Sequence, residues 1–288
     1  MIERNRKIVP LASLLILIAG CFCSFAHGQT VESAMDQSFH SMYNLQFDDA
    51  MKTAEAAKLI DRSDPMPWVA QSCSVLFREF ERLHILRSEM FATDESFAAR
   101  TAQKWDPATK KQFEDATNGA EKIAQERLNR DKNDIKGLFA LALVNGLRAD
   151  DAALIVKKNM AAIGYTKAAT GYADRLLALA PNYYDAYVAT GMGKYIVGGK
   201  PAPVRWLLRL NGLKGDQEEG VKELRTAAER GRYLAPFARI LLAFDDIRHK
   251  KRGEARKELA WLHSQFPNNP LFPLEIAKIE AGSAASGQ

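Results

Sequence analysis

The stretch ARKELAWLHSQFPNNP, residues 255–270, decides the fold. It places a small residue at Ala255, apolar residues at Leu259 and Leu262, and a Pro-Asn stop at 267–270. Residues 169–182, ATGYADRLLALAPN, repeat this pattern with drift. A small residue followed at helical spacing by apolar residues and a proline stop is typical of the second helix of a two-helix repeat. Such repeats bury their core by stacking and leave an extended surface for binding.

The overall composition is that of an ordinary globular protein with a real core. The 288 residues are 47% hydrophobic and 26% charged, and the formal net charge is +5. Two of these five charges belong to the first residues, where Arg4, Arg6 and Lys7 outweigh Glu3. A remaining charge this small does not indicate a nucleic-acid partner, so we expect none.

Residues 1–28 have the pattern of an export signal. Basic residues precede an apolar run over 8–20, and a small-residue site at 26–28 predicts cleavage before Gln29. The uncharged run approaches the length of a membrane span, but the three features in this order favour a cleaved signal over a retained anchor. We therefore predict an exported protein of the periplasm or cell envelope.

A second processing site overlaps the first. Residues 18–21, IAGC, are similar to a bacterial lipobox, in which the signal ends at residue 20 and Cys21 carries a lipid. Both interpretations stay open, and they differ in consequence: plain cleavage gives a free protein, whereas lipid at Cys21 associates it with a membrane. After plain cleavage Cys73 is the only cysteine, so no internal disulfide is possible.

The rest of the chain has helical periodicity and no alternating strand pattern. Small residues open the second helix of each predicted pair, at Ala50, Ala120, Ala169, Gly220 and Ala255. The last step, from 220 to 255, is close to a period of about 34 residues, while the earlier steps are longer. The excess falls within pairs, at inserts near 92–108, 149–164 and 198–215. We predict an all-α solenoid of about five helix-turn-helix units over 31–280, with a right-handed superhelical twist, and a disordered tail over 281–288.

Several longer motifs strengthen this prediction: YNLQFDDA at 43–50, REFERL at 78–83, Gly215-Asp216 with Gly220, GRYLAPFA at 231–238 and FPNNPLF at 266–272. Through them the chain resembles the tetratricopeptide repeat (TPR) family across 31–279, and more narrowly a group of exported bacterial TPR proteins of uncertain function. It departs from the pattern at the inserts and at Arg127, where a small or apolar residue is usual. The resemblance implies protein binding by a helical superhelix and brings no catalytic residues with it.

Signals for enzyme chemistry are weak. None of the five histidines pairs with another His or Cys at metal-ligand spacing, and no P-loop or G-x-S-x-G motif occurs. Acidic pairs such as Asp48-Asp49 and Glu218-Glu219 open helices, where carboxylates suit the helix dipole. We expect no catalytic residue, no metal and no cofactor.

Two candidate binding surfaces remain. The first is a basic amphipathic insert with an apolar Trp-Leu-Leu core, which either docks on a membrane surface or partner or, as the preferred interpretation, packs on its own repeat. Its site residues are Lys200, Arg205, Trp206, Arg209 and Lys214. The second is the concave face, where first helices of such repeats point into a groove suited to a peptide. Its predicted residues are Phe39, Tyr43, Lys136, Phe139, Leu143, Asp185, Met192, Tyr195, Phe244 and Arg248.

The sequence therefore predicts a non-catalytic scaffold or adaptor of the bacterial cell envelope that binds a protein or peptide segment. The alternative is a lipid-anchored lipoprotein that helps to assemble or tether a membrane complex. Neither the partner nor the oligomeric state can be inferred from the residues.

Overall fold

The computed structural model describes residues 30–87, 100–210 and 212–286, and within these ranges it contains helices and no strand. The predicted signal segment with Cys21 and most of the first insert lie outside the described residues. No helix in the described ranges combines the length and apolar character that a membrane span requires.

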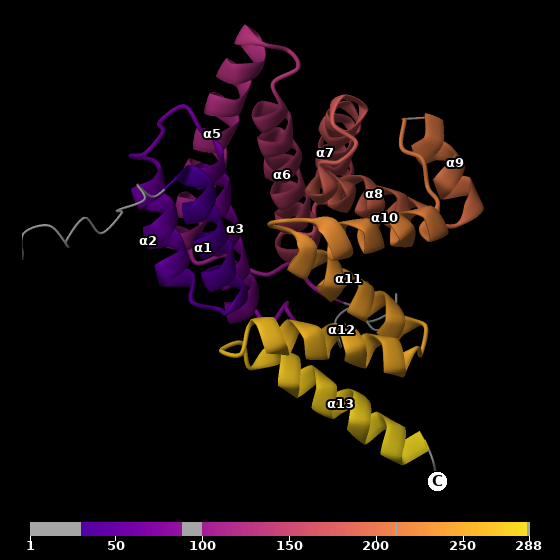
Figure 1. Cartoon of the computed structure of the whole chain (residues 1–288). Coiled ribbons are helices and arrows are strands. Elements are labelled where there is room, and N and C mark those ends of the chain that lie inside the picture. The colour runs from indigo at the N-terminus through magenta and orange to yellow at the C-terminus, as the bar shows by residue number, and fades with distance from the viewer. Residues whose placement is uncertain (1–29, 88–99, 211, 287–288) are drawn as a thin grey trace, which may run out of the picture.

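The helices pack as five successive hairpins followed by one last helix (Figure 1). The hairpins are α1 (Val31–Tyr43) with α2 (Phe47–Ala57), α3 (Met66–Arg82) with α5 (Pro107–Arg130), α6 (Ile135–Asp150) with α7 (Asn159–Leu179), α8 (Tyr187–Gly198) with α10 (Gln217–Arg230), and α11 (Ala235–Arg248) with α12 (Arg252–Gln265). The second helix of each pair also packs on the first helix of the next. The predicted all-α, TPR-like solenoid of five units is thus confirmed.

Small residues set the close approach of paired helices, as predicted. Ala50, Ala120 and Ala255 are fully buried. A close crossing joins α8 and α10, where a Cβ added at Gly220 would lie 2.7 Å from the Gly191 carbonyl oxygen. A Cβ added at Gly191 would in turn lie 2.9 Å from the Gly220 carbonyl oxygen. Two glycines therefore let the two backbones touch where any side chain would hold them apart.

Aspartate side chains begin several of the helices. Asp106 accepts a hydrogen bond from the Thr109 N–H, Asp134 from the Gly137 N–H and Asp216 from the Glu219 N–H. Each satisfies one of the backbone donors that a helix start leaves without an intrahelical partner.

The inserts contribute local structure of their own. After α6 a π-helical turn (Asp151–Ile155) precedes α7, and the end of the first insert docks on it. The Trp105 indole donates to Asp151 Oδ1 at 2.7 Å, and the Gln103 N–H donates to the Ile155 carbonyl at 2.8 Å. Two inserts that are far apart in sequence thus support each other. The third insert forms α9 (Ala202–Leu210) between α8 and α10.

The C-terminal end differs from the prediction. The last helix, α13 (Leu271–Ser286), continues into the segment that the sequence predicts to be a disordered tail. The Gly and Ser residues that suggested a tail do not end the helix.

The array closes on itself, because the first hairpin contacts loops of the last two units. The Tyr43 hydroxyl donates to the Tyr233 carbonyl at 3.0 Å, and the Asn269 amide donates to the Tyr43 carbonyl at 2.9 Å. The Phe39 and Tyr233 rings stack with centroids 5.2 Å apart. Figure 1 shows the loop between α12 and α13 beside the first hairpin. The first helix therefore does not face an open groove.

Candidate functional site

A pocket of about 370 Å³ opens where this closure brings the two ends of the array together. It lies among α1, the loop before α3, the start of α6, the connection before α8, which contains a 3₁₀ turn (Tyr184–Ala186), and the loop between α10 and α11. Its lining combines aromatic rings with both signs of charge: Val31, Glu32, Met35, Asp64, Met66, Ile135, Lys136, Asn182, Tyr183, Tyr184, Asp185, Arg230, Arg232 and Tyr233.

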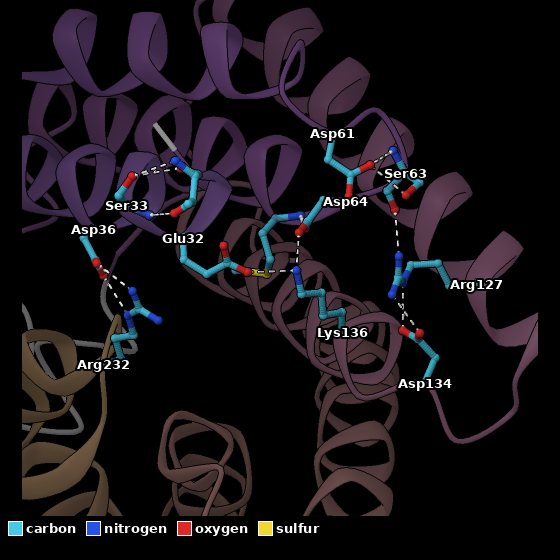
Figure 2. A network of polar contacts seen from close by, with 12 residues as sticks. Glu32, Ser33, Asp36, Asp61, Ser63, Asp64, Arg127, Asp134, Lys136 and Arg232 are labelled. Carbon is cyan, nitrogen blue, oxygen red and sulfur yellow. Dashed lines mark hydrogen bonds and ion pairs between the residues drawn. The ribbon is translucent and has the colours of Figure 1, made fainter. Parts of the chain in front are cut away.

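Lys136 lies at the centre of the charged network on one side of this pocket (Figure 2). Its Nζ donates to Asp64 Oδ2 at 2.6 Å and to Glu32 Oε1 at 3.1 Å. Burial opposes its charge, but the hydrogen bond and charge of Asp64, and then those of Glu32, hold the pKa of Lys136 above its ordinary value. This lysine therefore links α1, the loop before α3 and α6 as a fixed cation.

The network extends to Arg127, the residue at which the chain departs from the usual repeat pattern. Its guanidinium donates twice to the Asp134 carboxylate, at 2.9 Å each, and once to the Ser63 carbonyl at 3.2 Å. Asp134 is also the cap of α6. Arg127 thus anchors the helix that carries Lys136 (Figure 2), and the departure has a structural role.

Asp185 shapes the opposite wall. It is only 5% exposed, and it accepts hydrogen bonds from the Leu234 N–H at 2.9 Å and the Tyr233 N–H at 3.2 Å. Burial raises the pKa of Asp185, although these backbone donors oppose the shift. A Cβ added at Gly231 would lie 2.6 Å from Asp185 Oδ1, so the loop wraps tightly around this carboxylate. Asp185 therefore positions the loop between α10 and α11.

The same loop is held to α1 from outside. Arg232 donates from Nε and Nη2 to the Asp36 carboxylate, at 2.9 and 2.7 Å (Figure 2). The hydrogen bond to Asp36 raises the pKa of Arg232 above its ordinary value. Both side chains remain about half exposed, so the pair orients the loop more than it stabilises the fold.

One cation of the pocket has no acidic partner. The Arg230 guanidinium lies 4.2 Å from the centroid of the Tyr184 ring, in cation–π geometry. Among the described residues no carboxylate forms an ion pair with it, and its side chain is exposed. Arg230 is thus a preoriented donor for an acidic group that enters the pocket.

The structure divides the predicted concave-face residues. Phe39, Tyr43, Phe139 and Asp185 are buried, with Phe139 at 0% exposure. Their partners belong to the chain itself: the Phe139 ring, for example, packs against Tyr183 with centroids 4.8 Å apart. The structure therefore places Phe39, Tyr43 and Phe139 in the core and not in an open groove, whereas Asp185 lines the pocket.

The other predicted residues lie apart from one another. Lys136 lines the pocket, and Leu143 and Met192 pack partly buried on the core. The Tyr195 hydroxyl donates to Asp245 Oδ1 at 2.7 Å, which joins α8 to α11. Half-buried Phe244 and Arg248 lie on α11 outside the pocket lining. Of the ten, the pocket unites only Lys136 and Asp185, and ligand contact at the other exposed positions stays a prediction.

The pocket residues that the prediction missed include Tyr183, Tyr184, Arg230 and Arg232, which lie at helix ends or in loops. GRYLAPFA at 231–238 contains Arg232 and Tyr233, but it was assigned to the repeat pattern alone. The useful signal was the cluster of two tyrosines and Asp185 directly before α8, because aromatic and charged residues in loops are typical of binding sites.

A second, larger depression of about 840 Å³ lies on another face. It is lined by Asn44, Leu45, Phe47, Arg78, Glu79, Glu81, Arg82, Lys104, Trp105, Asp106, Thr109, Asn268 and Pro270. Its central charges are already engaged: Glu79, which is buried, accepts from Arg82 at 2.6 Å and from the Asp106 N–H at 2.8 Å. These contacts fix the start of α5, so this face serves the fold.

The acidic pair Asp150-Asp151 lies at the junction of α6 with the π-helical turn. Burial, and then the neighbouring charge of Asp151, raises the pKa of Asp150 to about 7. Within the described residues no group of three or more His, Cys, Asp or Glu side chains is arranged to hold a metal ion. The raised pKa of half-buried Asp150 thus reflects its local surroundings and the charge of Asp151, outside the pocket.

Comparisons with known proteins find a likeness among solved structures. No protein-family model matches the chain, and no curated protein matches it. Among solved structures, a thermophilic TPR protein from Thermus thermophilus aligns over 82% of this chain and 91% of its own, with 14% sequence identity and a TM-score of 0.42. We describe the present chain as an all-α, TPR-like helical-repeat protein because of the five stacked hairpins in its structure.

Proposed function

We propose that the protein is a non-catalytic scaffold, exported to the bacterial cell envelope, that binds a peptide or protein segment in the pocket between α1, α6 and the loop joining α10 to α11. Stacked helical hairpins are typical of protein-binding scaffolds. The pocket supplies a partly exposed apolar floor at Ile135, aromatic rings at Tyr183 and Tyr184, and charges on both sides.

The observation that carries the proposal is Arg230. It stacks on Tyr184 at the pocket rim and forms no ion pair among the described residues, whereas Lys136 and Arg232 are both paired. An acidic side chain or a terminal carboxylate of the bound segment would complete the charge balance, and the ring would pack against its neighbouring residue.

The test is selection from a library of random peptides, followed by affinity measurement with variants. We expect enriched peptides to share an acidic group, and Arg230→Ala and Tyr184→Ala each to weaken them by about tenfold or more, as loss of a charged hydrogen bond does. Arg225→Ala is the matched control, because Arg225 is an exposed arginine on the same helix outside the pocket. Equal losses for Arg225→Ala and Arg230→Ala would reject the pocket as the binding site.

The buried residues are unsuitable for this test. Substitution of Phe139 would open a cavity in the core, and substitution of Tyr195 would break its bond to Asp245, so either would report on folding instead of ligand contact.

A second candidate is a lipid-anchored lipoprotein that helps to assemble or tether a membrane complex. The IAGC stretch at 18–21 supports it, since it is similar to a lipobox. Mass spectrometry of the mature N-terminus separates the two. A free N-terminus at Gln29 excludes the lipid anchor, and a lipidated Cys21 excludes plain cleavage.

A further inference from the structure

The insert helix α9 presents an apolar face that the fold leaves uncovered. Trp206 and Leu210 are each 65% exposed, and their spacing of four residues places them on one side of the helix. Leu208 points the other way, since it lies about 160° around the helix from both. It is buried against Val197 and Leu213 and holds α9 to its own repeat. Packing on the repeat therefore explains the apolar residue on the Leu208 side of α9 and leaves the Trp206 and Leu210 side uncovered.

The insert that carries this face has charges of one sign, although Asp216, Glu218 and Glu219 follow it directly and Lys214 interacts electrostatically with Asp174 of α7. Residues 198–215 contain Lys200, Arg205, Arg209 and Lys214 and no acidic residue. All four cations are exposed, and within the described residues none of them forms an ion pair. Arg205 contacts only a carbonyl oxygen, that of Gly198, at 3.3 Å.

The position of α9 leaves it accessible. It stands at the edge of the array, away from α1–α3, in Figure 1. Among the described helices α9 packs mainly on α8, and Ile163 of α7 also packs against its Leu208 cluster. Of the four tryptophans in the chain, all of which lie in the described ranges, Trp206 is the one whose side chain is exposed. Trp68, Trp105 and Trp261 are buried or half-buried.

We propose that α9 docks on the surface of an anionic phospholipid membrane. Trp206 and Leu210 would enter the headgroup–acyl boundary, while the four cations pair with lipid phosphates. An exposed apolar stripe beside unpaired cations on a short helix is the arrangement that binds such interfaces. Each Lys or Arg near an anionic surface strengthens attachment by roughly fivefold, which is about 1 kcal/mol. The inference is independent of the peptide pocket.

The experiment is vesicle co-sedimentation of the purified mature protein, with phosphatidylcholine vesicles compared with vesicles that also contain phosphatidylglycerol. We expect binding only to the anionic vesicles, and its loss in high salt. A lipid at Cys21 would instead anchor the protein to both vesicle types. Equal binding to both types would therefore overturn the inference.

Variants locate the contact. We expect Arg205→Glu/Arg209→Glu to weaken binding by at least about 25-fold, at about fivefold for each lost cation. Trp206→Ser/Leu210→Ser should reduce it at least about tenfold through lost apolar burial. The matched control for the charge change is Lys52→Glu/Lys122→Glu, because Lys52 and Lys122 are exposed lysines of α2 and α5. The matched control for the apolar change is Leu59→Ser, because the Leu59 side chain is 75% exposed. If the controls weaken binding as much as the α9 variants, α9 is not the contact.

Trp206 also supplies a direct optical signal. Its fluorescence should shift to the blue on binding to anionic vesicles, and Trp206→Phe should remove the shift while keeping most of the binding. The membrane assignment is contradicted if the wild-type fluorescence does not shift. It is also contradicted if Trp206 and Leu210 prove to form a dimer contact or to bind another protein.

Discussion

Replacing Asp185 by Ala tests whether this residue anchors a loop, as the structure indicates, or contacts a ligand, as the sequence suggested. The carboxylate accepts two buried backbone N–H groups, those of Tyr233 and Leu234. Leaving a buried donor without a partner costs about 1–3 kcal/mol, so two donors amount to about 2–6 kcal/mol. Part of this cost is offset, because burial raises the pKa of the Asp185 carboxyl and its removal relieves that unfavourable burial. We expect a net loss of about 2–4 kcal/mol in the free energy of unfolding.

The assay is urea denaturation combined with amide hydrogen exchange. Because the loop that Asp185 anchors also carries the contacts to α1, the Asp185→Ala variant should exchange faster at 232–234 and in α1, as well as unfold at lower urea. Asp131→Ala is the matched control: Asp131 is an exposed aspartate in the preceding α5–α6 loop that accepts one N–H, from Asn133. It should cost less than about 1 kcal/mol. An Asp185→Ala variant as stable as the control would refute the anchoring role.

Three further predictions concern the core. Gly220→Ala should lower the free energy of unfolding by about 1–3 kcal/mol in urea titrations, because the new Cβ would lie 2.7 Å from the Gly191 carbonyl oxygen. The control Gly146→Ala should be neutral or stabilising, because nothing lies within 4 Å of its new Cβ. Similar losses for both variants would contradict the close crossing of α8 and α10. Phe139→Ala should cost about 3–5 kcal/mol, and a loss below about 1 kcal/mol would show that the ring is not core. Asp150 holds its proton to about pH 7 in the folded chain but loses it near its ordinary pKa when unfolded, so its presence lowers stability as pH rises from about 4 to 7. Asp150→Asn should therefore match the wild type near pH 4 and exceed it in stability by up to about 4 kcal/mol at pH 8, at about 1.4 kcal/mol for each of about three pKa units, less where solvent reaches this half-buried residue. A difference in stability that does not change with pH would contradict the raised pKa of Asp150.

Local signals in the sequence predicted local structure well. The small residues at Ala50, Ala120, Gly220 and Ala255 indicated the second helices of pairs, because a small residue acts on its neighbours within one hairpin. The five units follow from these signals.

The candidate site was harder to predict, since it depends on contacts between the two ends of the array. Asp36 and Arg232 are 196 residues apart, and no periodicity relates them. Phe39 and Tyr43 have the spacing of groove residues, but an apolar residue on a first helix has the same pattern when another part of the chain covers it. Arg230 and Tyr184 lie outside the concave-face positions of first helices that the prediction used.

The closure of the array is the central claim, and a photo-cross-link tests it most directly. A photoreactive side chain in place of Asp36 should react mainly with residues 232–234, because the Asp36 carboxylate contacts Arg232 at 2.7 Å. The cross-linked peptides are identified by mass spectrometry. Adducts confined to the first two hairpins would show an open solenoid and would contradict both the closure and the pocket that it forms.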